Sequence, residues 1–233
     1  MSAVSGPVAV RRETPATWLS GLIQSTIGLK FIMAVTGLGL SLFVLGHMSA
    51  NLLAFVSPQR LDDYGKALRS VPAMLWAARL GLLAAVGLHI WAYLKLTGRN
   101  WSARPQGYRE VDYREAGFAS RSMRWTGPLL LVFVVYHLLD LTLGAVNPDF
   151  RPGQVYHNML ASLGRKHIAL FYLLAMGALA FHLWHGIWSM FQSLGLSQRR
   201  RQSFARGLAT VFTIVVAGGF ALVPVAVLVG WLK

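Results

Sequence analysis

Histidine is the side chain in this sequence best suited to do chemistry. The 233 residues include seven histidines and no cysteine, so disulfides, thiolate nucleophiles and cysteine-ligated iron–sulfur clusters are excluded. Four histidines, His47, His89, His137 and His182, follow one another at intervals of 42, 48 and 45 residues. Neutral imidazole is a common ligand of transition metals, and the spacing indicates that successive structural elements each supply one.

Long apolar stretches contain these histidines. Hydrophobic residues make up 55% of the chain and charged residues 13%, well below the roughly 25% charged residues of a soluble domain. Five stretches reach the roughly 20 residues that a membrane-spanning helix needs. They are Phe31–Val56, Ala73–Leu94, Trp125–Val146, Ile168–Leu196 and Gly207–Leu232. The sequence therefore predicts an all-α integral membrane protein with five transmembrane helices, and its apolar character argues against a nucleic-acid binder despite the net charge of +14.

The distribution of positive charge predicts the orientation. Five spans place the termini on opposite sides, and 14 of the 22 Lys and Arg residues lie on the side of the N-terminus. The positive-inside rule makes that side cytoplasmic and places the C-terminus outside. We divide the chain into a cytoplasmic segment, 1–29, and a membrane domain, 30–233, with an interfacial helix predicted over residues 17–30. The basic loop 99–124 either reflects topology alone or also docks a partner.

The histidines are predicted to lie in two layers, because consecutive spans run in opposite directions. At about 1.5 Å per residue, His47 lies roughly 25 Å and His89 roughly 10 Å from the cytoplasmic ends of their helices. His137 joins His47 in the outer layer, and span four supplies the partner of His89. Two facing histidines suit axial ligation of a b-type haem, which favours electron transfer over oxygen chemistry. Position alone does not decide between His182 and His185, which lie about 60° apart on one helix face.

Five stretches then carry a family resemblance. They read MAVTGLGLSLFVLGHMSANL, GLHIWAYLKLTGRN, SRSMRWTGPLLLVFVVYHLL, VYHNM and AFHLWHGIWSMFQSLGL. In this order they resemble the di-haem cytochrome b membrane anchor of the succinate dehydrogenase and fumarate reductase family, in its bacterial five-helix, single-subunit branch. The resemblance implies that His47 with His137, and His89 with His182, ligate two b-type haems within the first four helices. It favours His182 over His185, because the family position that matches His185 is not always histidine.

The resemblance also implies partners and a reaction. A flavoprotein with covalent FAD and an iron–sulfur protein would dock on the cytoplasmic face of the bacterial inner membrane, and the complex could form a higher oligomer. Succinate oxidation would take place in these partners. This chain would be the non-flavin membrane subunit of the enzyme, passing electrons through haem to a quinone, expected to be menaquinone, in the respiratory chain and tricarboxylic acid cycle. One departure is Ala180, where some members have an acidic residue linked to transmembrane proton movement.

Several charged residues have both a functional and a plain structural interpretation. Asp140 either accepts a proton near the outer haem or a quinone, or, as we favour, is an end-of-helix acid that reaches the interface. Arg79 either binds a propionate of the outer haem or extends to the headgroups. The cations at the cytoplasmic helix ends have a functional interpretation, in which they contact the propionates of the inner haem or the iron–sulfur partner. In the structural interpretation they only set the topology. These cations are Lys30, Arg121 and Arg124.

Two other functions are compatible with intramembrane histidines. A transporter that binds a metal ion or relays protons would usually contain inverted repeats, and no repeat is visible in the sequence. The anchor cytochrome b of another respiratory complex would keep the haems and change the partners. The remaining histidines, His157 and His167, are expected at the interface rather than among the ligands.

Overall fold

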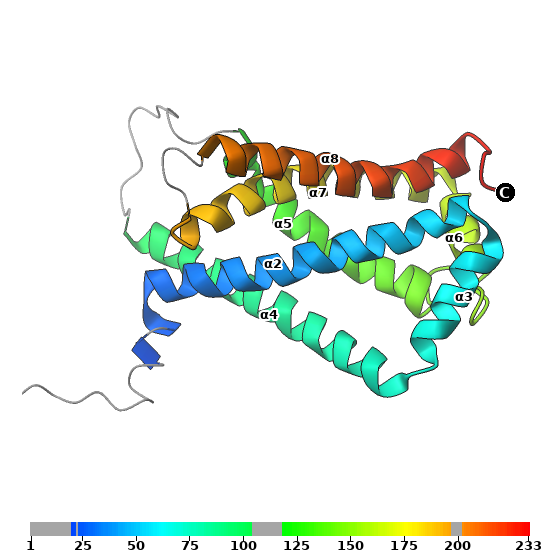
Figure 1. Ribbon diagram of the computed structural model, residues 1–233, viewed down its shortest axis with the longest axis horizontal. Helices are drawn as coiled ribbons and strands as arrows, with labels where there is room; N and C mark the ends of the chain where they lie inside the picture. Colours follow the sequence, from blue (N-terminus) through cyan, green and yellow to red (C-terminus); the bar gives the residue numbers. More distant parts are fainter. Residues whose placement is uncertain (1–19, 22, 104–117, 197–201) are drawn as a thin grey trace, which may run out of the picture.

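The computed structural model describes residues 20–21, 23–103, 118–196 and 202–233, and every regular element within them is helical (Figure 1). Five helices are long and apolar enough to cross a membrane, which confirms the prediction from the sequence. They are α2 (Thr26–Asn51, followed by the 3-10 turn η1, Leu52–Phe55), α4 (Pro72–Ser102), α5 (Phe118–His137, continued by the π-helical turn η2, Leu138–Thr142), α7 (Lys166–Ser193) and α8 (Gln202–Leu228). Two shorter helices, α3 (Pro58–Arg69) and α6 (Val155–Leu163), lie at one end of the bundle (Figure 1).

At the end of the bundle where α2 begins, α2, α4, α5 and α8 extend past the apolar stretches of the sequence, since a helix can continue into the polar headgroup region. At their other ends, η2 stops at Thr142 and α8 at Leu228, short of the predicted Val146 and Leu232. The Oγ of Ser25 accepts from the backbone N–H of Gly28 at 2.8 Å and caps α2, so the first span begins before Phe31. The predicted interfacial helix over 17–30 is therefore divided. Residues 26–30 belong to α2, residues 20–21 and 23–24 are helical, and 17–19 and 22 lie outside the described residues, as do most of segment 1–29 and of the basic loop 99–124.

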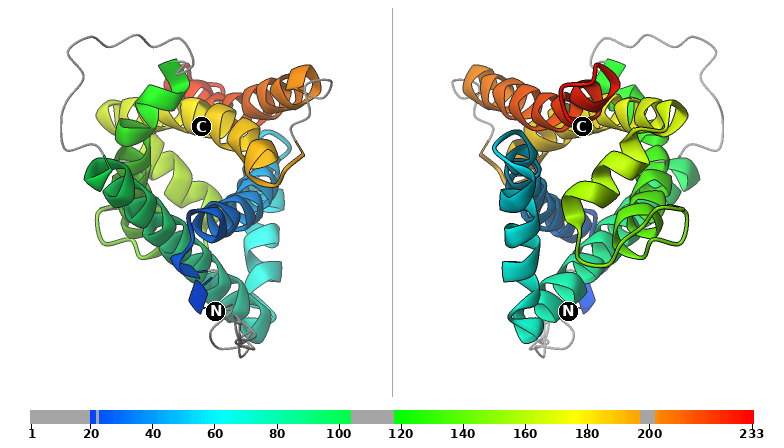
Figure 2. Two further views of the ribbon diagram at one scale, coloured as in Figure 1. Left: turned by 90° about the vertical axis from the view of Figure 1, so that its left-hand side faces the viewer. Right: turned by 90° about the vertical axis from the view of Figure 1, so that its right-hand side faces the viewer.

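The bundle is closed on one side and open on the other. Helix α7 packs against α2, α5 and α8, and α8 also packs against α2. Helix α4 packs along α2, whereas the described residues show no comparable packing of α4 on α5 or α7, nor of α2 on α5. Figure 2 shows the bundle end-on, with α2, α4, α5 and α7 around a common axis. In this arrangement α2 lies diagonally across from α5, and α4 lies diagonally across from α7.

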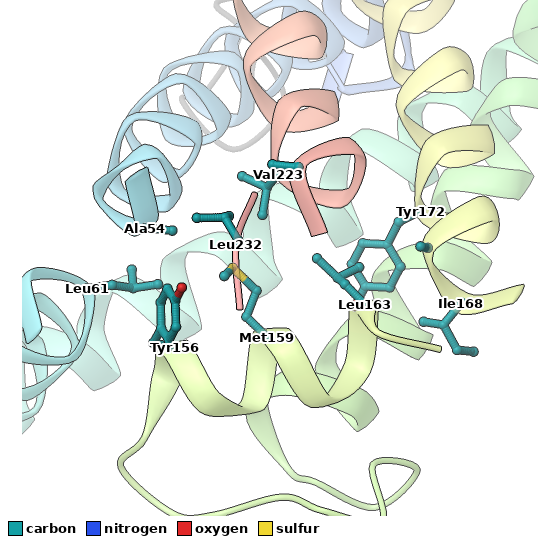
Figure 3. Close-up of a cluster of buried hydrophobic side chains, with 11 residues drawn as sticks. Ala54, Leu61, Tyr156, Met159, Leu163, Ile168, Tyr172, Val223 and Leu232 are labelled. Carbon is teal, nitrogen blue, oxygen red and sulfur yellow. The ribbon is translucent and has the colours of Figure 1, made fainter. Parts of the chain in front are cut away.

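A hydrophobic cluster closes the end of the bundle where the C-terminus lies (Figures 1 and 3). Met159 and Leu163 of α6 pack there with Val223 of α8 and with Tyr172 of α7. The backbone N–H of Tyr156 donates to Asp62 at 2.9 Å, which links α6 to α3. Helix α6 thus covers the turn η2 at the end of α5 and the first turns of α7, and α3 packs on the outside of α6.

Candidate functional site

Four of the predicted histidines meet in two pairs across the bundle. The ring centroids of His47 and His137 are 5.8 Å apart, and those of His89 and His182 are 6.3 Å apart. The first pair joins α2 to α5 and the second joins α4 to α7. These are the two diagonal helix pairs, whose backbones do not pack closely on each other. The imidazoles therefore approach one another where the helices themselves stay apart.

The separation within each pair fits one metal ion between two imidazoles. A bond from a metal to an imidazole nitrogen is about 2 Å long, so two axial rings on one metal have centres about 6 Å apart. Among the residues that the structure describes, no group of three or more His, Asp or Glu side chains is placed to hold a metal ion. Two imidazoles without a third protein ligand suit a metal whose remaining ligands come from a macrocycle, as in haem.

A glycine of α2 and a glycine of α5 lie next to the pair formed by His89 and His182. A Cβ on Gly37 would lie 3.4 Å from Cε1 of His89, and a Cβ on Gly127 would lie 4.0 Å from Cε1 of His182. Each glycine precedes the histidine of its own helix, His47 or His137, by ten residues, which is about 15 Å along a helix. Helices α2 and α5 therefore contribute a ligand candidate to the level of His47 and His137, the pair nearer to α6 (called the outer pair below), and a glycine to the level of His89 and His182 (the inner pair).

The structure distinguishes the two histidines of span four. His182 faces His89, whereas the ring of His185 lies 6.3 Å from that of Trp188 on its own helix. The Nδ1 atom of His182 is buried without a hydrogen-bond partner, and that of His89 lies 3.1 Å from the hydroxyl of Thr36. The second ring nitrogen, Nε2, is thus the one left for a ligand in the case of His89.

The outer pair is connected to a buried acid. The hydroxyl of Tyr172 lies 3.3 Å from Nδ1 of His137 and donates to Oδ2 of Asp140 at 3.0 Å. The guanidinium of Arg165 donates to Oδ1 of Asp140 at 3.0 Å, and the hydroxyl of Ser162 donates to Oδ2. Asp140 is fully buried, so the favoured interpretation of an end-of-helix acid that reaches the interface is wrong. It lies in the π-helical turn η2, where α6 and the start of α7 cover it.

The remaining candidates lie away from the centre of the bundle. Arg79 is exposed, and its guanidinium lies over the ring of Trp76 at 5.1 Å, an arrangement that suits the headgroup region. Lys30 and Arg124 are exposed, and Arg121 is half-buried in the first turns of α5. His167 is exposed at the start of α7. His157 lies in α6, where Nε2 is 3.0 Å from the carbonyl oxygen of Asp149, so both are outside the two pairs.

Sequence patterns do not identify the side chains that contact the paired histidines and Asp140. Thr36, Tyr172, Ser162 and Arg165 carry no motif. Their only signal is a polar group inside or just beside an apolar span, and neither periodicity nor hydropathy says which histidine such a group will meet.

Comparison with known proteins gives one family and no individual relative. The model of the succinate dehydrogenase/fumarate reductase transmembrane subunit family matches residues 98–222, which hold α5, α6, α7, most of α8 and two of the paired histidines, His137 and His182. No curated protein and no solved structure matches the chain. The match covers more than half of the chain and agrees with a multi-pass helical membrane protein. The chain therefore belongs to the succinate dehydrogenase/fumarate reductase transmembrane subunit family.

Proposed function

We propose that this chain is the di-haem, five-helix cytochrome b anchor of a bacterial succinate:quinone oxidoreductase. The observation that carries the proposal is the pair of imidazole contacts across both diagonals of the bundle, at 5.8 and 6.3 Å. In a protein without a large group between the helices, facing helices would pack on each other and bury apolar side chains. Here they stay apart and present imidazoles to each other.

His47 and His137 would hold the outer haem, and His89 and His182 the inner haem. When bound, the two haems supply one-electron carriers between an iron–sulfur partner and a membrane quinone, with menaquinone expected. With both histidines of a pair as its ligands, each haem would transfer electrons rather than bind oxygen, and the surrounding apolar helices would exclude water. Thr36 and Tyr172 orient the rings of His89 and His137 from the other nitrogen.

The partners would dock at the end of the bundle opposite α3 and α6. The start of α2 and the basic ends of α4, α5 and α8 lie at that end, which the positive-inside rule makes cytoplasmic. A flavoprotein with covalent FAD and an iron–sulfur subunit would bind there, while residues 30–233 form the cytochrome domain in the inner membrane. Lys30, Arg121 and Arg124 at this end would meet the inner propionates or the iron–sulfur subunit, and Arg79 is proposed for an outer propionate.

A haem count on the complex purified from its native membrane tests the proposal. We expect a pyridine haemochrome assay to give two b-type haems per chain, together with a covalently bound flavin in a co-purifying subunit. A preparation without haem would favour a transporter. A preparation with two haems but no flavoprotein would favour the anchor of another respiratory complex.

The glycine beside the inner pair gives a more local prediction. Gly37→Val adds a branched side chain where a Cβ would already lie 3.4 Å from His89, so we expect it to remove one of the two haems. The matched control is Gly39→Val on the same helix, because a Cβ at Gly39 meets no atom within 4 Å. Haem content per chain is the measurement. Equal haem contents in the two variants would contradict an inner site beside Gly37.

A further inference from the structure

Tyr172 links the outer histidine pair to a buried ion pair. Its hydroxyl proton is donated to Oδ2 of Asp140 at 3.0 Å, so the phenolic oxygen is left to accept from Nδ1 of His137 at 3.3 Å. In this arrangement Nδ1 of His137 carries the proton and Nε2 is free for a metal. The direction of donation thus runs from His137 through Tyr172 to Asp140.

The far end of this chain of hydrogen bonds is a carboxylate held by three donors. Ser162 and Arg165 donate to Asp140 in addition to Tyr172. The side chain of Asp140 is fully buried, whereas that of Arg165 is 27% exposed. A carboxylate is an acceptor-only group, and three donors suit it. Because charge-assisted hydrogen bonds are the strong ones, the carboxylate polarises Tyr172 and, through it, His137.

The inner pair has no equivalent among the described residues. His89 meets the hydroxyl of Thr36 at 3.1 Å, and that hydroxyl donates to the backbone carbonyl of Ile32 at 2.7 Å. Nδ1 of His182 has no partner. One pair is therefore backed by a charged network and the other by neutral groups alone, the hydroxyl of Thr36 and the backbone of Met33.

We infer that Tyr172 and Asp140 are positioning residues that set the reduction potential of the outer haem through His137. This rests on the proposed function, because it requires a haem between His47 and His137. An acceptor behind a ligating imidazole makes the ring more basic, and a more basic ligand favours the ferric over the ferrous state. Removing the network therefore raises the potential of the outer haem and leaves the inner haem unchanged.

The test is a spectroelectrochemical titration of the two haems in the purified complex. Tyr172→Phe removes the hydroxyl and keeps the ring, which packs edge-on against Phe133 at 5.0 Å. We expect the reduction potential of one of the two haems to rise by about 59 mV, which moves one of the two redox waves upward. For a one-electron step this is roughly a tenfold change in the equilibrium constant of reduction. The matched variant is Thr36→Val, which removes the neutral hydroxyl beside His89 and moves the other wave.

A second substitution separates the network from a general disturbance. Asp140→Asn keeps the size of the side chain and removes its charge, and we expect it to move the same wave as Tyr172→Phe. Since Asp140 acts through Tyr172, the double variant should shift that wave no further than Tyr172→Phe alone. The inference is overturned if Tyr172→Phe leaves both waves in place or moves both equally. Absence of two haems in the wild-type complex would instead contradict the proposed function.

Discussion

Alanine in place of His137 should leave one b-type haem per chain instead of two, because the haem proposed to lie between His47 and His137 would lose one of its two ligands. His47→Ala should have the same effect, and the combination of the two should cost no more than either alone. Combining His137→Ala with His182→Ala should remove both haems, since the two substitutions fall in different pairs. Pyridine haemochrome counts on the four purified variants give the pairing directly.

Two histidines of the same chain serve as controls for that series. His157 lies in α6 and contacts the carbonyl oxygen of Asp149, and His185 lies against Trp188. We expect His157→Ala and His185→Ala to keep two haems per chain. If His185→Ala lost a haem while His182→Ala kept both, the pairing of His182 with His89 would be wrong.

Removal of the buried carboxylate should have the largest effect on stability. Asp140→Ala removes the buried acceptor of Tyr172, Ser162 and Arg165, and Arg165 keeps only its bonds to two backbone carbonyls. Loss of the buried partner of an ion pair costs about 3 kcal/mol in free energy of unfolding when the other partner is partly exposed. For a chain of this size the expected fall in melting temperature is on the order of 10 °C. Thermal denaturation of the purified protein in detergent micelles, followed by circular dichroism, measures it.

An exposed ion pair provides the matched control for this prediction. Asp63 pairs with Lys66 at 3.2 Å on the surface of α3, where both side chains are well exposed. Exposed pairs contribute at most about 1 kcal/mol, so Asp63→Ala should lower the melting temperature by no more than a few degrees. Equal shifts for Asp140→Ala and Asp63→Ala would contradict a structural role for the pair of Asp140 and Arg165.

The spans and the histidine positions are the parts of the molecule that the sequence predicts well. Apolar length marks a membrane helix because lipid offers the backbone no partners, and helix rise converts residue number into depth. The alternation of helix direction then places His47 near the level of His137. Hydropathy does not mark the helix ends, since Ser25 caps α2 before its apolar stretch begins and α4 continues through polar residues to Ser102, past the fall in hydropathy after Leu94.

Side-chain orientation explains what the sequence could not predict. Asp140 was expected at the interface because hydropathy places it at the end of a span. The π-helical turn and the cover provided by α6 and the start of α7 bury it instead, and neither has a signature in the local sequence. The role of Tyr172 depends on contacts across 35 and 32 residues of chain, with His137 and Asp140, which only the packing of α5 on α7 creates.

The one-sided packing of α4 has a consequence for biogenesis. Lipid competes with protein for every helix surface in the bilayer, and a helix that touches its neighbours along a single face has the fewest contacts to lose. Across the bundle α4 meets the far side through His89, whose ring lies 6.3 Å from that of His182. If a haem joins these two histidines as proposed, its binding would fix α4 on its open face, and before that step α2 and α3 would be the helices that hold it.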